Sequence, residues 1–315
     1  MNKEIKYGFK NEREESFPSM IIMDITKVCN AECIHCPHSK VKNDPRFKNG
    51  PIYMSWEVFT KITDQVAQFP DTNFRFSCHG EPLLHPDFIK MIKYTKNKGL
   101  KLVSVNTNGS LLKKDLSEKI LDLGIDLIEV SLDAFNKETY NSIRRKLNYD
   151  TVISNLHNLV DLRNKKNSPT KIFVSIIDQP EVKDELKEFT TYWENLVDKV
   201  ITRIYFSINN LVDSSKVTFK PNYDRYPCPF LWKRITVNIE GYIKYCLEDW
   251  FDEKIIEYDL NEPIHKIWTS EKYNKIRKLH LEGKFNELEF CGKCEDWWVH
   301  WWEGDYFSAL RNYFK

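Results

Sequence analysis

The cysteines of this sequence have the clearest chemical potential, because seven of the eight fall into two groups. Three thiols lie within eight residues, four more end in a Cys-x-x-Cys pair, and one stands alone. The groups are Cys29, Cys33 and Cys36; Cys228, Cys246, Cys291 and Cys294; and Cys78. The polar N-terminus carries no secretory signal, and in a cytosolic chain clustered cysteines favour metal ligation or redox work over disulfides.

The first group puts three soft ligands on one short loop, directly after a β-rich run. Three thiolates can hold three corners of a cubane iron–sulfur cluster and leave its fourth iron open. On spacing alone, a zinc site completed by His35 or His38 is the alternative. The position of the loop after a strand favours the iron–sulfur cluster.

The same trio resembles the C-x3-C-x-φ-C signature of the radical S-adenosylmethionine (radical SAM) superfamily, with His35 at position φ. Further motifs of that superfamily follow in the expected order. They are the Gly-Glu-Pro turn at His79-Gly80-Glu81-Pro82, in which His79 replaces a glycine, and the strand ends Asn106-Thr107-Asn108-Gly109 and Ser131-Leu132-Asp133. The resemblance covers roughly residues 20–300 and implies one [4Fe–4S] cluster at the trio.

The resemblance also implies how the chain binds S-adenosylmethionine. Glu81 and nearby backbone groups would hold the methionine amino group, and Arg144 would lie near the carboxylate. Ser131 and Asp133 would contact the ribose hydroxyls, which need short polar partners. The predicted cofactor contacts are His35, Gly80, Glu81, Pro82, Asn106, Asn108, Ser131, Asp133 and Arg144. Taken singly, each motif has an ordinary reading as a turn or a helix cap.

The second cysteine group supplies four thiols for one further metal centre. Twelve residues separate Cys228 from Gly241, and four separate Gly241 from Cys246. This pattern resembles the SPASM/twitch modules of radical SAM enzymes, and the absence of further cysteines implies the twitch form, with one auxiliary [4Fe–4S] cluster. A zinc ribbon closed by Cys291 and Cys294 is the alternative.

Four thiolates would saturate the auxiliary cluster, which would then accept an electron instead of binding substrate. Hydrogen abstraction, proton loss and this electron transfer would together oxidise the substrate by two electrons. The spacing of the quartet resembles that of the twitch dehydrogenase for 2-deoxy-scyllo-inosamine. The resemblance therefore implies oxidation of a sugar-like or cyclitol-like alcohol.

Six β-rich runs alternate with amphipathic segments and must position these motifs. The predicted strands are 20–25, 73–77, 101–106, 127–132, 171–177 and 201–207. The predicted helices are 56–69, 87–98, 113–123, 151–163 and 181–197. Such β-then-α units imply an α/β fold with parallel strands, either a doubly wound sheet or a partial (β/α)6 TIM-like barrel. In both, the site lies at the carboxyl ends of the strands.

The remaining residues suggest a division of the chain. We expect an N-terminal extension at 1–18, a partial barrel at 19–215, an auxiliary-cluster domain at 216–300 with a hairpin around Gly241, and a C-terminal helix at 301–315. The 47 basic and 46 acidic residues give no electrostatic case for nucleic acid or a membrane surface as partner. No apolar run approaches the roughly 20 residues of a transmembrane helix, so a cytoplasmic protein is expected.

The sequence thus predicts a radical SAM oxidoreductase with two [4Fe–4S] clusters, S-adenosylmethionine, a small-molecule substrate and a flavodoxin- or ferredoxin-type electron donor. A peptide- or protein-modifying maturase is one alternative, although only about 18 residues precede the first strand to recognise a leader peptide. A redox-neutral epimerase with Cys78 as hydrogen-atom donor is another, and a zinc-binding interaction module is the non-enzymatic one. Candidate proton acceptors are Arg145, Asp178, Tyr205, Asn209 and Glu248.

Overall fold

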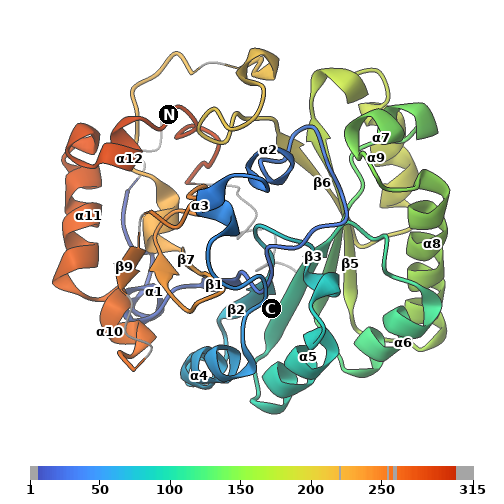
Figure 1. The fold of residues 1–315 in the computed structure, drawn as a ribbon, viewed down its shortest axis with the longest axis horizontal. Helices are drawn as coiled ribbons and strands as arrows, with labels where there is room; N and C mark the ends of the chain where they lie inside the picture. The colour runs from blue at the N-terminus through green and yellow to red at the C-terminus, as the bar shows by residue number, and fades with distance from the viewer. Residues whose placement is uncertain (1–5, 220, 254, 258–260, 303–315) are drawn as a thin grey trace.

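The computed structural model describes residues 6–302 apart from 220, 254 and 258–260. Within these residues nine strands form one sheet in the order β6-β5-β4-β3-β2-β1-β7-β8-β9 (Figure 1). The strands are β1 (Met20–Met23), β2 (Asn73–Phe76), β3 (Leu102–Thr107), β4 (Leu127–Ser131), β5 (Lys171–Asp178), β6 (Lys199–Ile204), β7 (Arg234–Val237), β8 (Ile243–Lys244) and β9 (Ile255–Glu257). The strands β1 to β6 are parallel, as expected.

The strand order decides between the two predicted architectures. Each of β1 to β5 pairs with the next strand along the chain, whereas a doubly wound sheet reverses its order. Because crossovers are right-handed, an unreversed order places every crossover helix on the same face of the sheet. Figure 1 shows these helices around the outside of a curved sheet, so the fold is the partial barrel.

The crossover helices lie close to the predicted positions, except for one short helix, α7 (Lys137–Ile143), that was not predicted. They are α4 (Trp56–Val66), α5 (Phe88–Asn97), α6 (Lys114–Asp122), α7 (Lys137–Ile143), α8 (Tyr149–Lys165) and α9 (Leu186–Glu194). In α4, the Ser55 side chain accepts a hydrogen bond from the Val58 amide, and Phe59, Ile62 and Val66 are buried on one face. The helix expected at 181–197 is shorter, because a 3-10 turn at Pro180–Val182 precedes α9.

The other helices lie before β1, after the cysteine loop and in the C-terminal segment. They are α1 (Glu12–Ser16), α2 (His38–Val41), α3 (Pro45–Lys48), α10 (Ile264–Trp268), α11 (Glu271–Leu281) and α12 (Glu289–Gly292). Further 3-10 turns lie at Pro82–Leu84, Ser214–Lys216, Pro229–Trp232 and Phe285–Glu287. No helix among the described residues is both long enough and apolar enough to cross a membrane.

The expected C-terminal hairpin is present and also joins the barrel sheet. β7 and β8 are antiparallel, and β7 pairs in parallel with β1, with Met20 opposite Arg234.

The domain boundary expected between residues 215 and 216 stays a prediction. The helix expected at 301–315 falls largely outside the described residues. The indole of Trp302 is buried and donates to the Pro227 carbonyl at 2.7 Å, so the described part of the Trp-rich segment packs against the protein.

The register of the parallel strands defines the inner face of the barrel. Ile22 of β1 lies opposite Arg75 of β2, and Asn106 of β3 lies opposite Glu129 of β4. Since neighbouring partners point to the same side, alternate residues of every strand face the interior. Met20, Ile22, Leu127 and Phe173 from these strands form a separate small apolar cluster with Phe230 of the 3-10 turn Pro229–Trp232.

Glu129 is fully buried on this inner face between two arginines. Its carboxylate accepts a hydrogen bond from Arg75 at 2.8 Å and another from Arg203. Burial alone would raise the pKa of Glu129, but the charges of Arg203 and Arg75 lower it to about 2. The carboxylate therefore stays ionised and joins β2, β4 and β6 across the interior.

Replacing Glu129 with Gln should lower the free energy of unfolding near pH 7 by about 3 kcal/mol, because the buried Arg75 guanidinium and the partly exposed Arg203 guanidinium lose their counter-charge. The folded pKa is depressed, so this stability is present above the unfolded pKa near 4.5 and disappears as the pH falls toward 2. Urea unfolding of Glu129→Gln and wild type at several pH values measures the difference. The half-exposed Glu118, changed to Gln, should stay within about 0.5 kcal/mol of wild type at every pH. A pH-independent difference for Glu129→Gln would contradict this assignment.

Candidate active site

The cysteine loop after β1 is tied to the ends of two other elements. The Glu32 amide donates to the Arg145 carbonyl at 2.9 Å, and the Ile34 amide donates to the Ile143 carbonyl at 3.0 Å. The Asn30 side chain accepts from Asn108 Nδ2 at 2.8 Å, just after β3. These bonds hold the loop over the carboxyl ends of the strands.

The three thiols of this loop suit a shared iron–sulfur cluster. Burial raises the pKa of Cys29 to about 11 and that of Cys36 to about 12, and neighbouring thiols add to the effect. Thiolates grouped in so apolar a site need a strongly positive centre, which iron supplies. Cys33 is buried and neighbours the Arg144 guanidinium.

Glu81 is buried at the start of the 3-10 turn after β2. Its carboxylate accepts hydrogen bonds from Thr107 Oγ1 and the Asn108 amide, each at 2.7 Å, and from the Leu83 amide at 3.2 Å. Burial nevertheless raises the pKa of Glu81. A carboxylate so placed, close to Cys29, has the electrostatic character to bind an ammonium or amine group.

Gly80, beside Glu81, lies where the backbone of another segment passes closely. A Cβ atom at Gly80 would lie 2.3 Å from the Thr26 carbonyl oxygen and 2.6 Å from that of Val28. Only glycine therefore allows this turn to pack against the segment that leads into the cysteine loop. Pro82 follows as the first residue of the 3-10 turn.

Asp133 and Arg144 meet beside the cysteine loop. The Asp133 carboxylate accepts from the Arg144 guanidinium and, at 2.9 Å, from the Ile177 amide, while His35 Nε2 lies 3.3 Å from the same carboxylate. Burial lowers the pKa of His35 to about 4, so its ring is neutral near pH 7. The Arg144 Nε atom has no hydrogen-bond partner, which leaves one donor of this buried group for a ligand.

The remaining predicted contacts lie at two levels of the barrel. Ser131 ends β4 and is partly exposed at the rim, with its hydroxyl 3.5 Å from that of Ser175. Asn108 binds the cysteine loop, but Asn106 points inward and accepts from Arg75. The structure thus brings Glu81, Asn108 and Asp133 around the loop and separates Asn106 from them. The roles of these residues in cofactor binding stay predictions.

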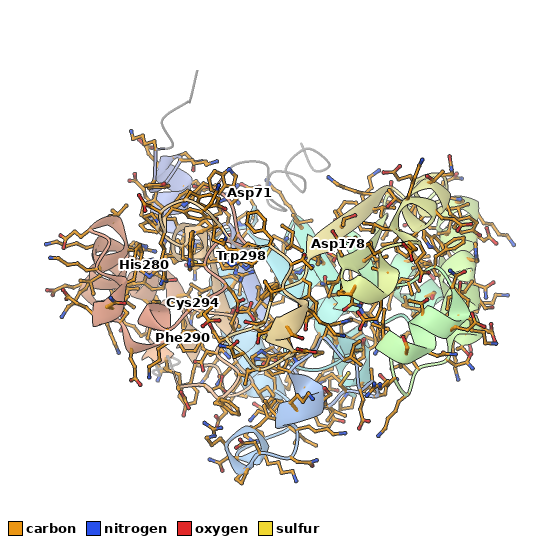
Figure 2. All side chains as sticks on the ribbon, turned by 90° about the horizontal axis from the view of Figure 1, so that it is seen from above. Asp71, Asp178, His280, Phe290, Cys294 and Trp298 are labelled. Carbon is orange, nitrogen blue, oxygen red and sulfur yellow. The ribbon has the colours of Figure 1, made fainter. Side chains whose placement is uncertain are left out.

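The cysteine quartet gathers from three separate segments. Burial raises the pKa of Cys246 well above its usual value, and Cys291, Cys294 and Cys228 add to the shift, so the four thiols are electrostatically coupled. The Cys228 amide donates to His280 Nδ1 at 3.2 Å. Figure 2 shows Cys294 and His280 on the side of the molecule opposite Asp178. Four coupled thiols without disulfides, of which Cys291 is buried and the other three are partly buried, fit a metal cluster.

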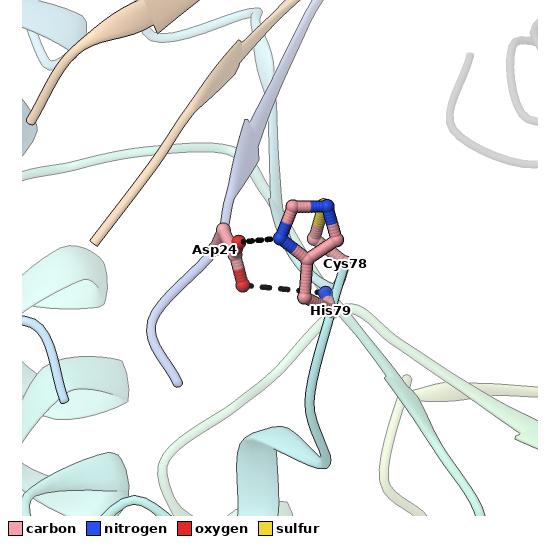
Figure 3. Close-up of side chains that lie close together, drawn as sticks. All are labelled: Asp24, Cys78 and His79. Carbon is pink, nitrogen blue, oxygen red and sulfur yellow. Dashed lines mark hydrogen bonds and ion pairs between the residues drawn. The ribbon is translucent and has the colours of Figure 1, made fainter. Parts of the chain in front are cut away.

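Asp24, Cys78 and His79 form a compact group at the ends of β1 and β2 (Figure 3). His79 Nδ1 lies 2.7 Å from Asp24 Oδ2, and the His79 amide donates to Asp24 Oδ1 at 3.3 Å. Cys78 has a φ of 132°, which side-chain-bearing residues rarely adopt. Burial raises the pKa of the Cys78 thiol well above its usual value, so the sulfur keeps its proton.

The candidate proton acceptors are scattered. Arg145 and Asp178 are exposed, and the Tyr205 hydroxyl donates to the Asp213 carbonyl at 2.9 Å. The Asn209 amide donates to Asp296 at 2.6 Å, next to the quartet. Burial raises the pKa of Glu248 to about 7. The structure does not bring the five together.

Three functional positions were not foreseen from the sequence. Asn30, inside the trio motif, orients the cysteine loop, and Asp24 holds His79. Arg234 faces the interior from β7. A polar residue inside an apolar strand run was the available signal for Asp24, whereas Arg234 depends on the pairing of β7 with β1.

Comparisons with known proteins match both parts of the chain. Residues 23–190 match the model of the Radical SAM superfamily, and residues 228–295 match that of an iron–sulfur cluster-binding domain, SPASM. A protein of Methanocaldococcus jannaschii described as a probable GTP 3′,8-cyclase is 28% identical over 287 residues, which cover 80% of this chain and 91% of that protein. A tungsten-containing aldehyde ferredoxin oxidoreductase cofactor-modifying protein of Pyrococcus furiosus is 24% identical over 311 residues, with 92% and 82% covered.

Solved structures share the fold at low sequence identity. BtrN, in complex with AdoMet and 2-DOIA, superposes with a TM-score of 0.59 at 16% identity, covering 90% of this chain and 98% of BtrN. SuiB of Streptococcus suis, bound to its precursor peptide SuiA, has a TM-score of 0.68 at 13% identity, with 94% and 73% covered. The two cysteine sets, the two family matches and the fold agree on two [4Fe–4S] clusters and S-adenosylmethionine as cofactors. The match to an iron–sulfur cluster-binding domain favours an iron–sulfur cluster over zinc at the quartet.

Replacing Gly80 with Ala should lower the affinity for S-adenosylmethionine at least roughly tenfold, because the new Cβ must push Glu81 and the cysteine loop apart. Equilibrium dialysis with reconstituted protein measures it. The matched control is Gly124→Ala, where a φ of +69° costs about 1 kcal/mol but nothing lies within 4 Å of the new Cβ. Affinity of Gly80→Ala within twofold of the control would contradict the close-packing role.

Proposed function

Since this chain belongs to the radical SAM superfamily, we propose that it oxidises a sugar-like or cyclitol-like alcohol by hydrogen abstraction followed by electron transfer to the auxiliary cluster. A cluster held by Cys29, Cys33 and Cys36 would supply one-electron reduction of S-adenosylmethionine, and one held by the quartet would supply an acceptor for the electron that remains on the substrate after it loses a hydrogen atom and a proton. The family matches identify a radical SAM enzyme with an auxiliary iron–sulfur domain.

One observation carries the proposal: the quartet adjoins the barrel interior. Cys228 and Leu247 pack against the interior apolar cluster that Cys78 also contacts. A substrate between Cys78 and Cys228 would lie near the cofactor site on one side and the quartet on the other. That arrangement supports an oxidation in which the quartet accepts an electron.

The proposal gives each of the following residues a role. Cys29, Cys33 and Cys36 hold the first cluster, and Cys228, Cys246, Cys291 and Cys294 hold the second. Glu81 accepts hydrogen bonds from the methionine amine, Arg144 donates to its carboxylate, and Asp133 and Ser131 bind the ribose. A flavodoxin- or ferredoxin-type protein supplies electrons.

The relatives offer two competing substrates. SuiB was solved with a peptide, and its likeness in fold keeps a peptide-modifying maturase as the second candidate. The similarity to probable GTP 3′,8-cyclases adds a nucleotide as a further candidate substrate. A cavity of about 450 Å³ inside the barrel favours a small molecule, since ligand pockets of 300–1,000 Å³ enclose compounds of that size.

Cys33→Ala should abolish 5′-deoxyadenosine formation, whereas Cys291→Ala should keep it and lose oxidised product, because only the second variant retains the first cluster. Wild type should hold about eight irons per chain and each variant about half. The measurements are iron content and mass spectrometry after incubation with a panel of polyols and cyclitols. Formation of oxidised product by Cys291→Ala would contradict the role of the auxiliary cluster as electron acceptor.

Cys78→Ala should retain oxidised product within about twofold of wild type, because oxidation needs no hydrogen-atom donor. The buried, protonated Cys78 thiol suits such a donor, so this variant tests the epimerase alternative. It is also the matched cysteine-to-alanine control for the two cluster variants. Loss of product with continued 5′-deoxyadenosine formation would favour epimerisation instead.

A further inference from the structure

The cavity inside the barrel is lined by positive charge. Its charged lining residues are Arg75, Lys199, Arg203 and Arg234, and no carboxylate lines it among the residues that the structure describes. Glu129, behind this lining, pairs with Arg75 and Arg203 and offsets one charge. Arg75, Lys199 and Arg203 each have further interactions, so Arg234 is the lining cation that bears on a ligand.

Arg234 is the cation most clearly available to a ligand. Arg234 is 9% exposed, and its Nη2 atom is buried without a hydrogen-bond partner. The guanidinium stacks 3.1 Å above the centre of the Phe230 ring, which also lines the cavity. Stacking fixes the plane of the guanidinium and leaves its N–H groups in a fork suited to two anionic oxygens.

Buried titratable groups surround Arg234. Burial lowers the pKa of Arg234 to about 10, while Glu248 and the thiols of Cys228 and Cys246 act in the opposite direction. Burial also lowers the pKa of His300, in the cavity wall, and the charges of Arg234 and Arg203 lower it further. His300 is thus neutral near pH 7 and adds no further charge.

We propose that the substrate of this enzyme carries an anionic group, a phosphate or a carboxylate, which the Arg234 guanidinium binds inside the barrel with Arg203 nearby. This inference rests on the proposed function, because it names the class of substrate for the same site. The anionic group would lie at the level of Met20, the partner of Arg234 across β1 and β7, and the rest of the molecule would extend toward Cys78. A buried arginine whose Nη2 lacks a partner gains most from a ligand that supplies one.

The test uses the reconstituted holoenzyme with S-adenosylmethionine and isothermal titration calorimetry at low ionic strength. The probes are glucose 6-phosphate, glucuronate and glucose, which share a ring and differ in charge. At least one anion should bind tenfold or more tightly than glucose, and the preferred anion identifies phosphate or carboxylate. Equal binding of all three, or no heat from either anion up to about 10 mM, would overturn the proposal.

Variants of Arg234 test whether this residue causes the preference for an anionic probe. Arg234→Gln should remove the preference for the anion, and Arg234→Lys should keep part of it, because the charge remains. Arg46→Gln is the matched control, since the Arg46 side chain is 58% exposed and pairs with Asp44 at the surface. An unchanged preference in Arg234→Gln overturns the proposal, and so does a shift in the potential of the auxiliary cluster alone, which would assign Arg234 to the quartet.

5′-Deoxyadenosine formation, measured on the same wild-type sample, separates this inference from the proposed function. Formation without a preference for anions leaves the radical enzyme standing and removes the anionic substrate. A preference for anions without 5′-deoxyadenosine removes the radical function instead. If Arg234→Gln loses iron, Arg234→Lys and the wild-type comparison of the three probes still decide the question.

Discussion

Carboxylates buried inside the barrel impose the constraint on which the rest of the structure depends. A buried carboxylate without partners would be strongly destabilising, so each one must meet donors or positive charge. Glu129 lies between two arginines, Glu81 accepts three hydrogen bonds, and Asp133 binds Arg144 and the Ile177 amide. Because these partners come from different strands, turns and a helix end, the same bonds that satisfy the carboxylates also hold the strand ends and the cysteine loop in one arrangement.

The two cysteine sets lie on either side of this polar interior. Burial raises the pKa of every thiol in both sets, and positive iron centres are what make such sites favourable. Cys228 touches the interior apolar cluster, so the quartet adjoins the space in which a substrate would react. Arg234 and Phe230 line the same space, where the arginine is stacked on the ring.

Local patterns predicted the elements well where an element is long and regular. The run expected at 127–132 is the strand Leu127–Ser131, and that at 171–177 is Lys171–Asp178. The helix α7 (Lys137–Ile143) went unpredicted because seven mostly polar residues show little periodicity. Its end nevertheless holds the cysteine loop, since Ile143 and Arg145 supply the carbonyls that the loop amides bind.

The sequence by itself determined the kind of chemistry, because cysteine spacing within a short loop is local and survives any arrangement of the rest of the chain. It also determined the parallel α/β class through the alternation of strands and helices. Only the tertiary structure decided the barrel, the pairing of β7 with β1 and the charge of the interior. Arg75, Arg203 and Arg234 are far apart in the chain and meet only because alternate residues of neighbouring parallel strands face the same enclosed space.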